Sequence, residues 1–166
     1  MSTDIFAFLG RYFGAVGIVF VVVNTALKWL QLRPRMRDSP ELAPGYMQLL
    51  LGFWLISTLP WIPMGIGILW GNVPTIWYFL YPSSGNPYVL AWWGVYWCWV
   101  SVLAYWILFK GGAKMLVTHP GFLRGNPKNS KWIKVGMLLA LVGTAIASVL
   151  IFNQAEPIIP DIPGSL

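Results

Sequence analysis

Long apolar runs dominate the chain, and each is long enough to form a membrane-spanning helix. Crossing the hydrocarbon takes about 20 mostly apolar residues in helical form. Runs of this kind occupy residues 12–32, 46–70, 88–109 and 133–152. A membrane β-barrel would instead show repeated segments of about ten residues with alternating apolar and polar positions. The pattern therefore predicts an all-α integral membrane protein with four transmembrane helices, forming a single membrane domain over residues 1–166.

The second and third runs are separated by turn-forming residues, because no charged residue occurs between Leu42 and Phe109. Pro, Gly and Asn cluster between residues 71 and 87, and such clusters interrupt helices. This segment is uncharged and aromatic, so we expect a short outer interfacial segment that lies on the membrane surface or is buried against a partner. The candidate partner residues in it are Trp77, Tyr78, Phe79 and Tyr81.

Prolines mark two further places along the chain. Pro60 and Pro63 lie within the second run and predict a kink, because proline removes a backbone donor from a helix. The tail, residues 153–166, contains several prolines and two acids. We expect this tail to be extended or disordered rather than helical.

The distribution of Lys and Arg predicts the orientation in the membrane. Short cytoplasmic loops carry an excess of these residues. All of the 11 Lys and Arg residues except Arg11 lie in two blocks, at residues 28–37 and 110–134. These blocks cover the loop between the first and second spans and the loop between the third and fourth. Both loops should therefore lie on the cytoplasmic side and both termini on the outer side. We expect a bacterial-type inner (plasma) membrane or a related energy-transducing membrane.

Composition excludes several classes of protein. Hydrophobic residues make up 57% of the chain and charged residues 10%, whereas soluble domains have about 25% charged residues. A soluble enzyme or nucleic-acid-binding module is therefore excluded, and the net charge of +6 reflects topology rather than nucleic-acid binding. With one His and one Cys, the chain lacks the ligands for its own zinc, iron–sulfur or bis-histidine haem site. We predict no metal site and no catalytic residues.

Small residues recur at helical spacing on three of the four spans. In lipid, where no hydrophobic force draws helices together, small faces let helix backbones approach closely. The predicted helix-packing residues are Gly10, Gly14, Gly17 and Asn24 on the first span, Gly94, Cys98 and Ser101 on the third, and Gly136, Ala140, Gly143 and Ala147 on the fourth. Packing within the chain and docking on another subunit both remain open for these faces.

The tryptophan-rich third span and the single histidine are the remaining candidates for ligand contact. Some aromatic side chains of this span lie deeper than an interfacial belt requires, where a lipid or a flat apolar ligand such as a quinone or pigment would stack. The candidate contacts are Trp92, Tyr96, Trp97 and Trp99, and ordinary packing is the alternative. His119 is a candidate ligand shared with another chain, or an ordinary loop residue.

The four spans carry no Asp, Glu, Lys, Arg or His near their centres. Transporters and pumps usually keep such residues within the membrane, and a membrane enzyme would need clustered carboxylates or histidines. The sequence therefore predicts a non-catalytic accessory, assembly or scaffold subunit of a larger membrane complex. Its expected partners are membrane lipids, other membrane subunits or its own copies. A small oligomeric transporter or channel is the alternative.

Overall fold

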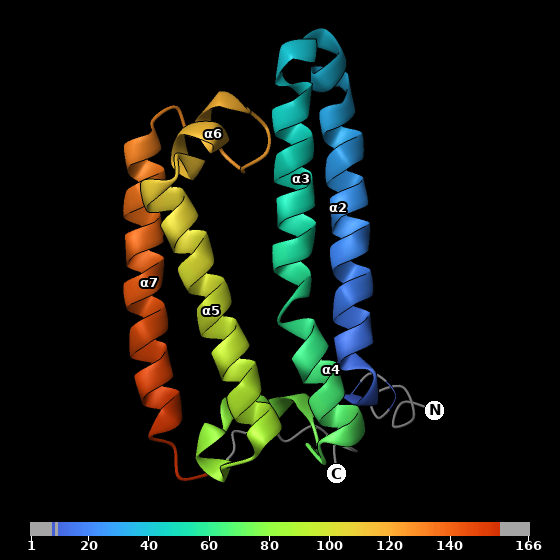
Figure 1. Cartoon of the computed structure of the whole chain (residues 1–166), viewed down its shortest axis with the longest axis vertical. Coiled ribbons are helices and arrows are strands. Elements are labelled where there is room, and N and C mark those ends of the chain that lie inside the picture. Colours follow the sequence, from blue (N-terminus) through green and yellow to red (C-terminus); the bar gives the residue numbers. More distant parts are fainter. Residues whose placement is uncertain (1–7, 9, 157–166) are drawn as a thin grey trace. The chain divides into compact units, whose positions relative to one another are not determined.

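The computed structural model describes residues 8 and 10–156, and this part of the chain contains helices and no strand. Four helical segments of the described part are long and apolar enough to cross a membrane (Figure 1), which confirms the all-helical, four-span prediction. The first is α2 (Phe13–Asp38), the third α5 (Pro87–Phe109) and the fourth α7 (Ser130–Phe152). Most of the predicted disordered tail, residues 157–166, lies outside the described residues.

Helix α2 continues beyond the apolar run that predicted it. The run ends near Leu32, whereas the helix ends at Asp38 and contains Pro34. Arg35 and Arg37 occupy the last turn, where the negative end of the helix dipole favours cations. Hydropathy marks the part of a helix suited to lipid, and polar turns can extend the helix beyond it.

The second span is a broken helix rather than a continuous one. It comprises a short 3₁₀ turn η1 (Pro40–Leu42), helix α3 (Ala43–Thr58) and helix α4 (Trp61–Trp70). The break falls at Leu59 and Pro60, as expected because the proline ring clashes with the preceding turn and lacks an N–H. Pro63 lies in the first turn of α4, where its missing N–H would have no partner within the helix.

The described chain divides into two compact units, each with its own buried core. Of the described residues, unit 1 contains 8, 10–20, 58–98 and 145–156, and unit 2 contains 21–57 and 99–144. Two 3₁₀ turns, η2 (Ile76–Leu80) and η3 (Pro82–Ser84), lie in unit 1. The short helix α6 (Gly112–Thr118) lies in unit 2, directly after α5 along the chain (Figure 1).

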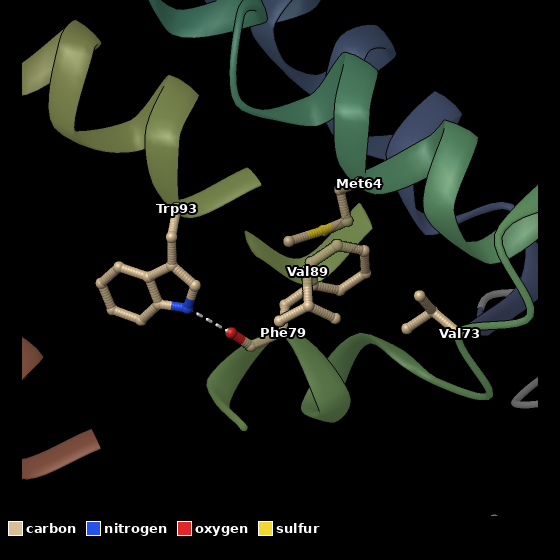
Figure 2. Packing of buried hydrophobic residues seen from close by; sticks show 5 residues of the cluster. All are labelled: Met64, Val73, Phe79, Val89 and Trp93. Atoms are coloured by element: carbon tan, nitrogen blue, oxygen red, sulfur yellow. Dashed lines mark hydrogen bonds between the residues drawn. The ribbon is translucent and has the colours of Figure 1, made fainter. Parts of the chain in front are cut away.

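The core of unit 1 is built around the segment that joins α4 to α5. Its buried members are Met64, Val73, Phe79, Val89 and Trp93 (Figure 2). Trp93 Nε1 donates a hydrogen bond of 2.9 Å to the carbonyl oxygen of Phe79. Asn86 Nδ2 donates to the carbonyl of Gly71 at 3.2 Å. The first bond holds the joining segment against α5, and the second connects the two ends of the segment.

The first turns of α2 pack against α4 through glycine. A Cβ added to Gly14 would lie 2.6 Å from the Cα of Gly65, so the two backbones are in direct contact. A Cβ on Gly17 would overlap the Trp61 ring. Phe13 also meets the Trp61 ring edge-on, at a centroid distance of 5.7 Å. The glycines of this face therefore serve packing inside unit 1.

Candidate functional site

A cavity of about 490 Å³ lies in unit 2 among α3, the second half of α5, α6 and the turn that follows α6. Binding pockets for small molecules commonly have volumes of about 300–1,000 Å³. The lining residues are Gln48, Leu49, Gly52, Phe53, Ile56, Ser57, Trp99, Val102, Leu103, Trp106, Ile107, Met115, Leu116, Phe122 and Leu123. No charged side chain is among them, so the cavity suits an apolar molecule rather than an ion.

Two lining residues show where the cavity opens. Phe53 is 39% exposed and Val102 is 54% exposed, and both lie well inside their membrane-spanning segments. The cavity is therefore open beside these two side chains.

The turn after α6 is fixed to α2 and α3 by hydrogen bonds to its backbone. The carbonyl of Pro120 accepts from Arg35 Nη1 at 3.0 Å and from the Tyr46 hydroxyl at 2.8 Å. Lys28 Nζ donates to the carbonyl of Gly121 at 3.4 Å. Gly121 has a φ of +86°, a backbone conformation that favours glycine. Lys28 and Arg35, which belong to the first basic block, thus also stabilise this end of unit 2.

His119 is buried in unit 2, with 7% of its surface exposed. Its Nδ1 donates to the carbonyl of Met115 at 2.7 Å, since a carbonyl can only accept. Its ring meets the Tyr46 ring edge-on at 4.8 Å, and its Nε2 lies against Gly45. These contacts give His119 a packing role within unit 2. Within the described residues, no group of His, Cys, Asp and Glu could hold a metal ion.

The candidate aromatic contacts of the third span are divided between the two units. Trp92, Tyr96 and Trp97 pack around the core of unit 1. Trp92 stacks on Tyr96 at a centroid distance of 5.5 Å, and its Nε1 donates to the carbonyl of Pro60 at 3.0 Å. Trp99 lines the cavity of unit 2. Of the four, Trp99 is therefore the candidate that belongs to this cavity.

The candidate partner residues between α4 and α5 pack largely within unit 1. Phe79 is fully buried, and Tyr78 packs against the same core. The Tyr81 hydroxyl donates to the carbonyl of Ala155 at 2.7 Å. Trp77 is half-buried. These contacts place Tyr78, Phe79 and Tyr81 against other parts of unit 1.

The small-residue faces of α5 and α7 are exposed, in contrast to Gly14 and Gly17. The exposed members are Gly94, Cys98 and Ser101 on α5, and Gly136, Ala140, Gly143 and Ala147 on α7. A Cβ added at Gly94, Gly136 or Gly143 would meet no other atom within 4 Å, and the same holds for Gly10. Asn24 is half-buried.

Sequence reasoning missed the residues that shape unit 2. Tyr46 and Gly45, which enclose His119, carried no signal of their own in an apolar run. Gly52 and Phe53 line the cavity, but no spacing rule relates them to Trp99 or Phe122, which are far away in sequence. The lone histidine was predicted as a shared ligand or an ordinary loop residue, and nothing in the sequence relates it to Tyr46 or Gly45.

Comparison of the chain with protein-family models, curated proteins and solved structures finds no match. Function is therefore inferred from the geometry of the chain itself.

Proposed function

We propose that the chain is a non-catalytic subunit of a larger membrane complex, with an accessory, assembly or scaffold role. The observation that supports this proposal is the exposed small-residue face of α7. Its members are Gly136, Ala140, Gly143 and Ala147. Small residues let another helix approach closely, which brings more backbone atoms into van der Waals contact than a face of large side chains allows.

The low burial of α7 also favours docking on a partner. Ser148 is the one buried residue of this helix. Large side chains project freely, with Leu139 68% exposed and Val149 61% exposed. A helix with so few contacts in its own chain can gain packing only from lipid or from another protein.

The orientation and location belong to the same proposal. Both termini lie outside, and the two basic loops lie inside, in a bacterial-type inner membrane or a related energy-transducing membrane. The charge bias supports this orientation, since Arg11 is the one Lys or Arg outside the two basic blocks.

A small oligomeric transporter or channel remains the alternative. Such a protein needs a polar path across the membrane, and ionisable residues usually mark that path. The sequence has no Asp, Glu, Lys, Arg or His from Leu42 to Phe109, and the cavity of unit 2 has no charged lining. These features favour the subunit over the transporter.

The proposal is tested by comparing Gly143→Leu with the neighbouring change Val142→Leu. Both positions are exposed, and the space around Gly143 is open, so the isolated chain should tolerate either substitution. On a partner helix, Leu at position 143 would separate the two backbones. We expect Gly143→Leu to lose the chains that co-purify in mild detergent, whereas Val142→Leu keeps them and both retain the wild-type thermal stability.

Two results would argue against the proposal. If both variants keep their co-purifying chains at the wild-type level, the α7 face is not a docking surface. If Asn24→Ala, Ser101→Ala or Thr144→Ala abolishes growth under conditions that demand the complex while assembly is normal, the transporter should replace the subunit.

A further inference from the structure

The cavity of unit 2 has the chemistry of a hydrocarbon site. Its polar side-chain groups are the amide of Gln48, the hydroxyl of Ser57 and the indole N–H groups of Trp99 and Trp106. The amide and the hydroxyl are at opposite ends of the lining part of α3, and Gly52, Phe53 and Ile56 lie between them. A quinone or pigment ring with polar substituents would need convergent donors at its binding site. A hydrocarbon tail needs none, so the lining fits an acyl chain better than a polar ring.

Gly52 contributes to the space in the cavity. A Cβ added at this position would meet no other atom within 4 Å. Glycine is unfavourable inside a helix, because it loses more backbone conformational freedom on folding than any other residue. Here the absent side chain leaves room in the middle of the lining of α3, beside the exposed edge of Phe53. An acyl chain can enter from the membrane through that exposed side.

Basic residues flank the end of the cavity formed by α6 and the turn after it. Lys114 directly precedes Met115, and Arg124 directly follows Leu123, and both are exposed. Lys128 lines a smaller hollow of about 190 Å³ that shares Leu116 and Leu123 with the cavity. The sequence has no acid from Leu42 to Ala155, so α3, α5, α6 and α7 supply no negative charge to neutralise these cations. The acids of unit 2 are Asp38, the last residue of α2, and Glu41, in η1.

From the lining, the opening and the charges, we infer that unit 2 binds one anionic phospholipid, with an acyl chain in the cavity and the phosphate beside Lys114 and Arg124. Hydrocarbon burial holds the chain, and the two cations select an anionic headgroup over a zwitterionic one. The site would tie a membrane lipid to the basic end of unit 2.

The acyl-chain part is tested with purified, delipidated protein in mild detergent, titrated with palmitoyl-oleoyl phosphatidylglycerol and observed by native mass spectrometry. We expect one tightly bound lipid. Gly52→Leu fills the cavity with a larger side chain. We expect it to weaken lipid binding at least about tenfold, because an apolar pocket loses this much affinity when it loses space for a methylene group. Gly94→Leu is the matched control, because its site is equally open but lies in unit 1, and it should bind within about twofold of wild type.

Thermal unfolding without added lipid shows whether Gly52→Leu is folded. Val102→Trp blocks the exposed side of the cavity and provides a second filling variant.

The headgroup part is tested with Lys114→Gln combined with Arg124→Gln. This variant should bind phosphatidylglycerol no better than phosphatidylcholine, with phosphatidylcholine binding unchanged.

Three results would overturn the inference. One is equal binding of phosphatidylglycerol and phosphatidylcholine to the wild type, with no effect of either filling variant. Another is displacement of the bound lipid by an equal concentration of ubiquinone, which would assign the cavity to a ring ligand. The third is loss of co-purifying chains in Gly52→Leu with unchanged lipid binding, which would assign the cavity to a partner helix.

Discussion

The indole N–H of Trp93 donates a hydrogen bond of 2.9 Å to the backbone carbonyl of Phe79, and both residues are buried in the core of unit 1 (Figure 2). The bond joins the first part of α5 to the 3₁₀ turn η2. It gives a buried carbonyl a partner that lipid could not supply. The packing of the aromatic segment within unit 1 depends on this contact.

Trp93→Phe should therefore destabilise the protein. Phenylalanine keeps an aromatic ring but leaves the Phe79 carbonyl without its donor, which costs about 1–3 kcal/mol. The control is Trp132→Phe, because Trp132 is 73% exposed and a surface change usually shifts stability by less than about 0.5 kcal/mol. Thermal unfolding in detergent measures both, and equal unfolding temperatures would show that the bond contributes nothing.

Gly14 and Gly10 should respond differently to substitution by alanine. Gly14→Ala places a Cβ against the Cα of Gly65, so we expect a loss of about 1–3 kcal/mol from overpacking. Gly10→Ala has open space and should be neutral or slightly stabilising, since alanine is the better helix former. The free energy of unfolding in detergent measures both changes. The close approach of α2 and α4 is refuted if Gly14→Ala is as stable as Gly10→Ala.

The charge distribution predicts one orientation in the membrane. A reporter that is active only in the cytoplasm should be inactive when fused after Leu166 and active when inserted near Arg124, in the second basic block. Equal activity at both positions would indicate dual topology. Activity after Leu166 alone would reverse the proposed orientation.

The spans could be predicted from the sequence because lipid imposes a simple length and polarity rule on helices. The rule does not set helix ends, as the extension of α2 to Asp38 shows. Pro60 predicted an irregularity, and the structure shows how Pro60 ends one helix and begins another. Such features follow from covalent geometry, which is local in sequence.

The candidate site could be predicted only in part, because it depends on contacts between distant segments. Gly14 and Gly143 have the same local signal, but only Gly14 has a helix against it in the described structure. Trp99 was one of four aromatic candidates for ligand contact. It differs from the other three because it lines the cavity together with Phe53 and Phe122, which come from distant segments. His119 is buried because Tyr46 and Gly45 enclose it, which its position in a basic loop did not indicate.

The most direct test of the proposed subunit role is the mass and composition of the particle that contains the wild-type chain. The chain would be extracted from its own membrane in mild detergent and weighed by native mass spectrometry. We predict a particle heavier than the 18.6 kDa chain, with other membrane chains present at a fixed ratio, and release of this chain by Gly143→Leu. A particle made only of this chain or of its own copies, with growth fully supported, would contradict the proposed function.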